Sequence, residues 1–253
     1  MKQNIPKHIK MNNQDTIDVV YFITENYWEL TLNSIKHLKL FYRSNSPLVI
    51  TVFYIGKKPV YIGDDIIFRE LESKENSYFF IRRPEVFKLM NKKFIFIDSD
   101  TIIQTCISKL YNIELNEKVL GAVPCYYMKY YRNTFDFYGP TEDLLSTYGD
   151  TLNSDSLLFF NAGVLLIDGK KWNTHNYSDR FAEIYELYKN SWYKFMDEIA
   201  FNLVLSNDNI LELDMRWNYN LEDSGRRYIT HCYGKPSKNK PDYYSTLNIN
   251  KLK

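Results

Sequence analysis

"FIFIDSDTII", residues 94–103, decides the fold, because it joins an apolar run directly to Asp98, Ser99 and Asp100. The apolar run is typical of a buried strand, and the two acids follow at its carboxyl end. Two carboxylates one residue apart repel each other, and burial penalises the charge of both. We therefore expect a positively charged partner beside Asp98 and Asp100.

Apolar runs on either side of this stretch predict strands and helices in alternation. Residues 19–23, "VVYFI", read as a buried strand, and the apolar residues between Tyr27 and Phe41 recur at helical spacings of three and four. Further strands are expected at 47–55, 65–71, 94–97, 118–124, 159–167, 210–213 and 228–231, and further helices at 83–90, after a Ser178 cap and from Asp197 onward. This alternation is typical of an α/β fold with a largely parallel, helix-covered sheet. Ligands bind beyond the carboxyl ends of such strands, where the two acids lie.

Composition and charge place the chain among ordinary globular proteins. Hydrophobic residues make up 45% and charged residues 25%, and the formal net charge is +1. Nucleic acids and anionic membranes require a basic excess, so neither is an expected partner. Since no repeat or linker divides the chain, we expect one domain over 1–253, with a polar extension at 1–17 and a tail at 242–253.

Three features bear on the location of the protein. The N-terminal residues are polar and lack the apolar stretch of a signal peptide, and no run approaches the length of a membrane span. The cysteines Cys106, Cys125 and Cys232 are odd in number and fit neither a disulfide framework nor a zinc site. We therefore expect a reducing, cytoplasmic setting. The oligomeric state stays open, a dimer included.

The acid pair has three readings on its residues alone. In the first, Asp98 and Asp100 lie in a surface turn. In the second, their hard oxygens hold Mg²⁺ or Mn²⁺, which in turn binds a diphosphate. In the third, Asp98 serves a phosphohydrolase of the haloacid dehalogenase class, whose pattern wants Thr or Val four residues later; that position is Ile102, and Thr101 comes one residue early. Glycine-rich phosphate cradles are absent from the sequence, which argues against dinucleotide and P-loop sites.

Two other stretches carry polar residues within apolar runs. "FFNAGVLLI", 159–167, contains Asn161 and Gly163, which is typical of a bulged strand, and a buried Asn needs hydrogen-bond partners such as a polyhydroxylated ligand. His231 ends an apolar strand before a Lys-rich stretch. It reads either as a core histidine or as a third metal ligand beside phosphate-binding lysines.

Five motifs occur in an order that resembles glycosyltransferase family 8, the family of glycogenin and the bacterial lipopolysaccharide galactosyl- and glucosyltransferases. They are D-x-D, F-N-A-G-V-L-L-I-x-x-x-x-W, D-x-x-x-x-N, W-N-Y and H-x-x-G, and they cover roughly residues 18–241. The resemblance implies a GT-A fold, that is, a Rossmann-like, mostly parallel mixed sheet flanked by helices. It further implies retaining transfer of a hexose, glucose or galactose, from a UDP-sugar to a saccharide or protein acceptor, with Mn²⁺ or Mg²⁺ as cofactor.

Matching positions imply roles for individual residues. The metal ligands are expected to be Asp98, Asp100 and His231, and the catalytic pair beside the anomeric carbon to be Asp197 and Glu198. The residues expected to bind the uridine, diphosphate or sugar of the donor are Thr24, Asn26, Tyr27, Ser99, Asn161, Ala162, Gly163, Gly234, Lys238 and Lys240. The resemblance leaves open which of the two lysines contacts the diphosphate.

The chain departs from the family pattern at several positions. Thr24 stands where the family often has Asp, Phe80 where it has a donor-binding Arg, and Glu198 where it has Gln. Arg82 or Arg83 is expected to replace that Arg, and the Trp that follows the family's last motif is missing. These departures keep a sugar-nucleotide-binding protein without turnover as an alternative, beside the phosphohydrolase.

The long aromatic stretch at 125–158 shows weak periodicity, which is typical of a functional loop. It stands between the two halves of the predicted sheet, so we expect it to shape the acceptor site.

Overall fold

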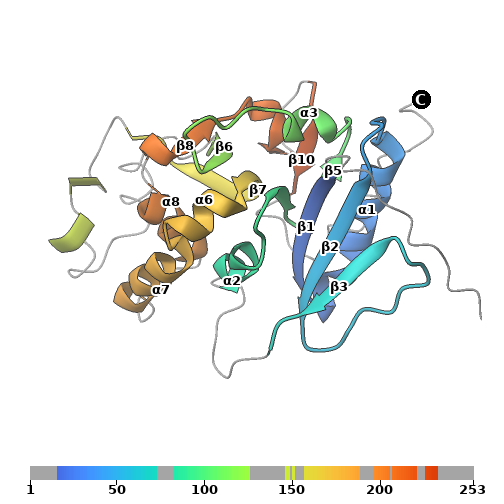
Figure 1. Ribbon diagram of the computed structural model, residues 1–253, viewed down its shortest axis with the longest axis horizontal. Helices are drawn as coiled ribbons and strands as arrows, with labels where there is room; N and C mark the ends of the chain where they lie inside the picture. Colours follow the sequence, from blue (N-terminus) through green and yellow to red (C-terminus); the bar gives the residue numbers. More distant parts are fainter. Residues whose placement is uncertain are drawn as a thin grey trace, which may run out of the picture.

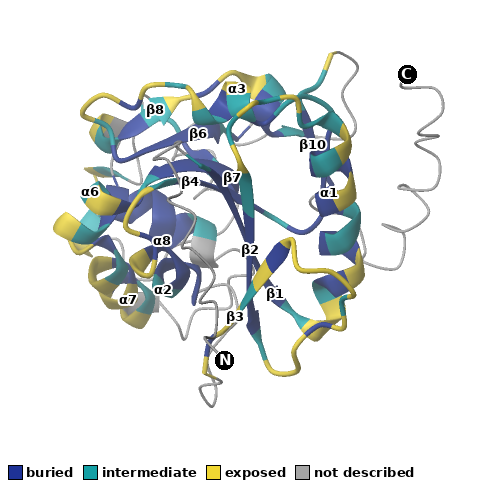
Figure 2. Cartoon of the chain, turned by 45° about the vertical axis from the view of Figure 1, so that its right-hand side comes forward, coloured by how far each residue is buried: buried dark blue, intermediate teal, exposed yellow. Residues whose placement is uncertain are grey.

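The computed structural model describes residues 16–72, 82–125, 146–148, 150–151, 157–188, 196–205, 207–220 and 226–232. Within this part of the chain, seven strands form one sheet in the order β3-β2-β1-β4-β7-β6-β8, and β5, β10 and β9 form a second, small sheet (Figure 1). Helices cover both faces of the larger sheet (Figure 2). The α/β prediction is confirmed.

The first half of the chain follows the alternation that its apolar runs predict. Its elements are β1 (Ile17–Thr24), the 3₁₀ turn η1 (Glu25–Tyr27), α1 (Trp28–Phe41), β2 (Leu48–Ile55), β3 (Ile66–Glu70), α2 (Arg83–Lys88), β4 (Lys93–Ile97), β5 (Thr101–Ile103) and α3 (Ser108–Tyr111). β1 pairs in parallel with β2 and β4, and β2 pairs in parallel with β3. The predicted polar extension is one residue too long, because Ile17 already belongs to β1 and is buried in the core.

The second half makes the sheet mixed. Its elements are β6 (Leu120–Pro124), β7 (Phe160–Asp168), α6 (Gly169–Thr174), α7 (Tyr177–Tyr188), α8 (Met196–Leu205), η3 (Asn207–Asn209), β8 (Ile210–Glu212), η4 (Met215–Trp217), β9 (Tyr219–Asn220) and β10 (Ile229–His231). β7 runs antiparallel to both of its neighbours, β4 and β6, whereas β6 and β8 are parallel. The sheet is therefore mostly but not wholly parallel.

One capping prediction is wrong. α7 begins at Tyr177, before Ser178. The Ser178 hydroxyl donates to the Pro84 carbonyl at 2.7 Å and accepts from the indole N–H of Trp172 at 2.8 Å. The hydroxyl of Ser178 therefore forms its hydrogen bonds with Pro84 and Trp172, outside the helix, whereas the local capping rule expected it to bond to the backbone at the start of the helix.

Alternating side chains of the central strands fill two separate cores. Helices α2, α6, α7 and α8 lie on one side of the sheet and α1 lies on the other (Figure 2). Side chains of β1 and β4 alternate between the two cores that these helices cover. The first face takes Val20, Phe22, Phe94 and Phe96, and the second takes Val19, Tyr21, Ile23, Ile95 and Ile97. Strands buried on both faces read as continuous apolar runs, which is why 19–23 and 94–97 were recognisable from sequence.

None of the helices in the described ranges is long and apolar enough to span a bilayer. Cys106, Cys125 and Cys232 form no disulfide with one another.

Three segments meet where β4 stops. β4 ends at Ile97, and the backbone N–H of Asp98 donates to the carbonyl of Gly163 at 2.8 Å. Because β7 is antiparallel to β4, its first residues lie beside the last residues of β4. β10 pairs with β5 so that His231 lies opposite Thr101. The acid pair, the start of β7 and the end of β10 therefore share one corner of the fold.

β7 bulges at this corner. Ala122 of β6 pairs with Leu165, but the next residue, Val123, pairs with Asn161, so the register on β7 jumps past three residues. This irregularity confirms the bulged strand expected from the Asn and Gly in the apolar run.

Candidate active site

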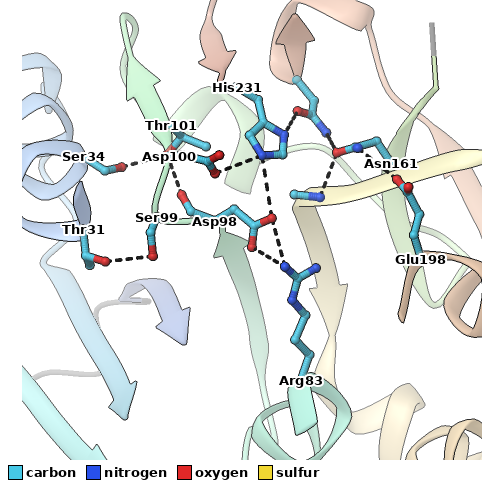
Figure 3. A network of polar contacts seen from close by, with 12 residues as sticks. Thr31, Ser34, Arg83, Asp98, Ser99, Asp100, Thr101, Asn161, Glu198 and His231 are labelled. Carbon is cyan, nitrogen blue, oxygen red and sulfur yellow. Dashed lines mark hydrogen bonds and ion pairs between the residues drawn. The ribbon is translucent and has the colours of Figure 1, made fainter. Parts of the chain in front are cut away.

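A buried arginine faces the first acid of the pair. Arg83, the first residue of α2, donates through Nη2 to both carboxylate oxygens of Asp98, at 2.8 and 3.0 Å (Figure 3). Arg83 is only 9% exposed, so water screens this ion pair little. Arg83 provides a positive partner of the kind that two neighbouring acids require.

Arg82, the other candidate, points elsewhere. Its guanidinium donates to Glu85, at 2.7 and 3.2 Å, and to the backbone carbonyl of Glu72 at 2.5 Å. Arg83 therefore contacts the acid pair, whereas Arg82 stabilises the start of α2.

His231 completes a group of three side chains with donor atoms suited to a metal ion. Its Nε2 lies 3.2 Å from Oδ1 of Asp100 and 3.7 Å from Oδ2 of Asp98. One ligand atom from each of the three residues lies within 4.8 Å of the others. Hard carboxylate oxygens with one imidazole nitrogen form a donor set that fits Mn²⁺, or Mg²⁺ in its place. The structure brings the three predicted ligands together.

Gly163 provides the surface on which the imidazole of His231 lies. A Cβ added at Gly163 would come within 2.0 Å of Cε1 and 2.4 Å of Nδ1 of that ring. Such distances are far below van der Waals contact, so any larger residue must displace the ring. The Gly in the N-A-G motif is therefore required by a side chain of β10 that lies 68 positions later in the sequence.

We predict that Gly163→Ala disrupts the metal site while the fold survives. Moving the imidazole off its position should lower Mn²⁺ affinity by about 10–100-fold, as mutation of residues that orient a metal ligand usually does. Calorimetric titration with Mn²⁺ in the presence of UDP measures this. Gly121→Ala is the matched control, because the three heavy atoms nearest to its added Cβ all belong to the flexible side chain of Leu213; equal losses in the two variants would refute the explanation.

Two asparagines connect the histidine to Glu198. Asn218 contacts Nδ1 of His231 through Oδ1 at 2.9 Å and donates through Nδ2 to Oδ1 of Asn161 at 2.6 Å. Asn161 donates in turn through Nδ2 to Oε1 of Glu198, on α8, at 2.9 Å (Figure 3). Glu198 therefore lies within hydrogen-bond reach of the N-A-G motif.

A chain of hydroxyl groups holds the acid pair from behind. The hydroxyl of Thr101 donates to the carbonyl of Asp98, so it accepts from Ser34, and Ser34 accepts from Tyr21, at 2.9, 2.8 and 3.0 Å respectively. Burial raises the pKa of Tyr21 well above its ordinary value, so its hydroxyl keeps the proton that starts the chain. The hydroxyl of Thr31 meets that of Ser99 at 2.8 Å. Through these contacts, helix α1 holds the backbone of the segment from Asp98 to Asp100 in place.

The segment expected to bind uridine lies at the end of β1. Thr24 is the last residue of the strand, Asn26 is exposed, and Tyr27 is partly buried. The hydroxyl of Thr31 donates to the carbonyl of Tyr27 at 2.9 Å and also contacts Ser99, so this segment is tied to the acid pair. β1 and β4 are parallel neighbours, so their carboxyl ends open at the same edge of the sheet.

Some predicted site residues lie outside the described residues. They are Gly234, Lys238 and Lys240, as well as Phe80 and most of the predicted acceptor loop at 125–158. Asp197 belongs to α8, but its side chain is not among those described.

Sequence reasoning missed several residues that organise the site. Asn218 was visible only as the middle of the W-N-Y motif, and Asn202 as the end of D-x-x-x-x-N. Asn202 bonds both the N–H and the carbonyl of Phe160, at 2.8 Å each, and so fixes the start of β7 to α8. A polar residue inside an otherwise apolar motif was the signal that could have identified both.

Curated relatives match parts of the chain. "Probable galacturonosyltransferase-like 2" of Arabidopsis thaliana is 29% identical over 127 residues, 49% of this chain and 36% of that protein. "Glycosyltransferase GlyD" of Streptococcus pneumoniae is 32% identical over 136 residues, 51% of this chain and 13% of that protein. The matched segments thus span about a third or less of the length of these two relatives.

Solved structures share the fold over nearly the whole chain. The galactosyltransferase LgtC, in complex with donor and acceptor sugar analogues, superimposes with a TM-score of 0.69 at 16% identity, covering 92% of this chain and 96% of that one. GlyE of Streptococcus pneumoniae gives a TM-score of 0.62 at 16% identity, covering 94% of this chain and 62% of that one. Both are GT-A glycosyltransferases, and the chain has the GT-A fold.

The family model described as "Glycosyl transferase family 8" matches residues 9–245, which is most of the chain. This match agrees with the order of the five motifs and with the corner at which D-x-D, N-A-G and His231 meet. The chain belongs to glycosyltransferase family 8.

Proposed function

We propose that this glycosyltransferase is metal-dependent and retaining, and that it transfers a hexose from a UDP-sugar to a saccharide or protein acceptor. The observation that carries the proposal is the convergence of Asp98, Asp100 and His231 at the carboxyl edge of the sheet. Mn²⁺, or Mg²⁺ in its place, would be held by these three side chains. When bound, the ion supplies positive charge that offsets the diphosphate of the donor and stabilises UDP as it leaves.

The chain's own residues have distinct tasks in this proposal. Thr24, Asn26 and Tyr27 bind uridine at the end of β1. The bulge at Asn161, Ala162 and Gly163 faces the transferred sugar, and Glu198 reaches it from α8. The side chains around Arg83, Ser99 and α1 keep the acid pair in place; Gly234, Lys238 and Lys240 are proposed to contact the diphosphate.

Wider features of the proposal rest on other observations. The match over residues 9–245 supports one GT-A domain, and the odd number and wide spacing of the cysteines support a cytoplasmic location. Glucose and galactose are the proposed sugars, and the names of the relatives add galacturonic acid to those worth testing. Membership of a glycosyltransferase family removes the support for a phosphohydrolase.

We predict slow release of UDP from a UDP-sugar in the presence of Mn²⁺, because water can replace a missing acceptor. UDP-glucose, UDP-galactose and UDP-galacturonic acid are each incubated with the protein, and UDP is measured. Removing the metal with EDTA should stop the release, and adding Mn²⁺ should restore it. Binding of UDP-sugar without any release indicates a binding protein, and phosphate release from a simple monoester indicates a phosphohydrolase; either result overturns the proposal.

A further inference from the structure

A backbone group fixes the orientation of the first amide behind the metal site. The N–H of Gly163 donates to the side chain of Asn161 at 2.9 Å. A backbone N–H can only donate, so the atom that it meets must be the amide oxygen, Oδ1. The amide nitrogen of Asn161 then points to the carboxylate of Glu198, which accepts. Both contacts agree, so the orientation of this amide does not depend on a choice between oxygen and nitrogen.

The same logic fixes the second amide and then the imidazole. The oxygen of Asn161 accepts, so the Asn218 atom that lies 2.6 Å away must be its nitrogen. The oxygen of Asn218 is therefore the atom 2.9 Å from Nδ1 of His231, and Nδ1 must carry a hydrogen. Nε2 is thereby the nitrogen left to bind a divalent ion. Asn218 and His231 are 6% and 3% exposed, so water competes little for these bonds.

Nε2 points toward two acids. It lies at hydrogen-bond distance, 3.2 Å, from Oδ1 of Asp100 and 3.7 Å from Oδ2 of Asp98, so either a hydrogen on Nε2 or a divalent ion can join the ring to the carboxylates. Hydrogen bonds behind a metal-binding histidine determine its tautomer and ring orientation and strengthen its bond to the metal.

We propose that Asn218 is a positioning residue that holds His231 in the tautomer with hydrogen on Nδ1, so that Nε2 is ready to bind a divalent ion. The proposal rests on the proposed function, since it takes Asp98, Asp100 and His231 as the ligands. The side-chain amide of Asn161 is hydrogen-bonded to both Asn218 and Glu198. One hydrogen-bonded chain therefore joins the proposed metal ligand His231 to the proposed catalytic residue Glu198.

The tautomer is measured directly by ¹⁵N NMR of histidine-labelled protein without metal. The chain has four histidines, and the signals of His231 are those that disappear in His231→Ala. In the wild type we expect a protonated Nδ1, whether or not Nε2 also carries a hydrogen toward Asp100. A ring with a hydrogen on Nε2 and none on Nδ1 would overturn the proposal. This measurement does not depend on whether an Asn218 variant folds.

Two variants of Asn218 test its effect on the metal. Asn218→Leu keeps the size but removes both hydrogen bonds, so the other tautomer should appear and Mn²⁺ affinity should fall about 10–100-fold. Asn218→Asp keeps an acceptor for Nδ1–H, so the tautomer should persist and the affinity should stay nearer to that of the wild type. Unchanged tautomer and affinity in Asn218→Leu, or equal losses in both variants, would contradict the proposal.

Two further variants separate the possible failures. Thr230→Val removes a buried hydroxyl that donates to Gln104 from the position next to His231, and it should leave Mn²⁺ affinity unchanged. Asp100→Asn should lose Mn²⁺ binding. If Asp100→Asn binds Mn²⁺ like the wild type, the metal site itself is wrong; if it loses binding while Asn218→Leu does not, only the role of Asn218 is wrong.

Discussion

Asp100→Asn should abolish Mn²⁺-dependent binding of UDP while the protein stays folded. Asp100 is a buried carboxylate beside His231 and, in the proposed site, holds the ion through an oxygen. An amide keeps the shape of the side chain but removes the negative charge that a hard cation needs. UDP binding is measured by calorimetry with Mn²⁺ and with EDTA, and folding by circular dichroism and thermal unfolding.

Asp100 is the better test of the two acids. Asp98→Asn should also abolish binding, but it removes the charge that faces the buried Arg83, and breaking a buried ion pair destabilises a protein by about 3–5 kcal/mol. His231→Ala should weaken Mn²⁺ binding less completely, because one neutral ligand is lost while both carboxylates remain.

Asp65→Asn is the matched control for the acid substitutions. Asp65 pairs with Lys39 at the far end of α1 and is exposed. Its replacement should leave UDP and Mn²⁺ binding unchanged. Should Asp100→Asn bind UDP with Mn²⁺ as tightly as this control does, the assignment of the acid pair to a metal is wrong.

Most strands were predictable from sequence because burial on both faces leaves a continuous apolar run. The direction of β7 was not, since an apolar strand reads the same whether its neighbours run parallel or antiparallel to it. That direction decides the site, because it places Asn161 and Gly163 beside the end of β4. The alternation of strands and helices favoured parallel pairing throughout the sheet, so it could not indicate that β7 is antiparallel to its neighbours.

The site residues were predictable where the sequence motif itself contains the functional side chain. They were not predictable where only the tertiary structure shows which of several residues makes a contact. Asp98, Asp100 and His231 were expected as ligands and do lie together. Arg82 and Arg83 are adjacent in sequence, and only the packing of α2 shows which one faces Asp98. Gly163 was expected to permit a bulge. The structure shows that glycine is required there because the ring of His231, far away in the sequence, lies against it.

Glu198→Gln should lower turnover by about 100-fold or more while leaving UDP affinity nearly unchanged. We propose that a carboxylate oxygen of Glu198 attacks the anomeric carbon as the bond to the UDP oxygen breaks, and that UDP leaves with the electron pair. The acceptor hydroxyl then attacks the same carbon, the bond to Glu198 breaks, and the hydroxyl proton passes to the phosphate oxygen that UDP freed in the first step. Two inversions give net retention. A Gln amide is too weak a nucleophile for the first step.

The structure indicates that Glu198→Gln changes the reactivity of the side chain without removing its hydrogen bond. Glu198 accepts from Nδ2 of Asn161 through Oε1, and the amide oxygen of Gln can accept that same hydrogen bond. The chain through Asn161 to His231 is anchored by the N–H of Gly163, so Mn²⁺ affinity should also be retained. Glu183→Gln, on the exposed face of α7, is the control and should keep full turnover. If Glu198→Gln keeps full turnover as well, the carboxylate is not the nucleophile, and retention arises by attack of the acceptor on the face from which UDP departs.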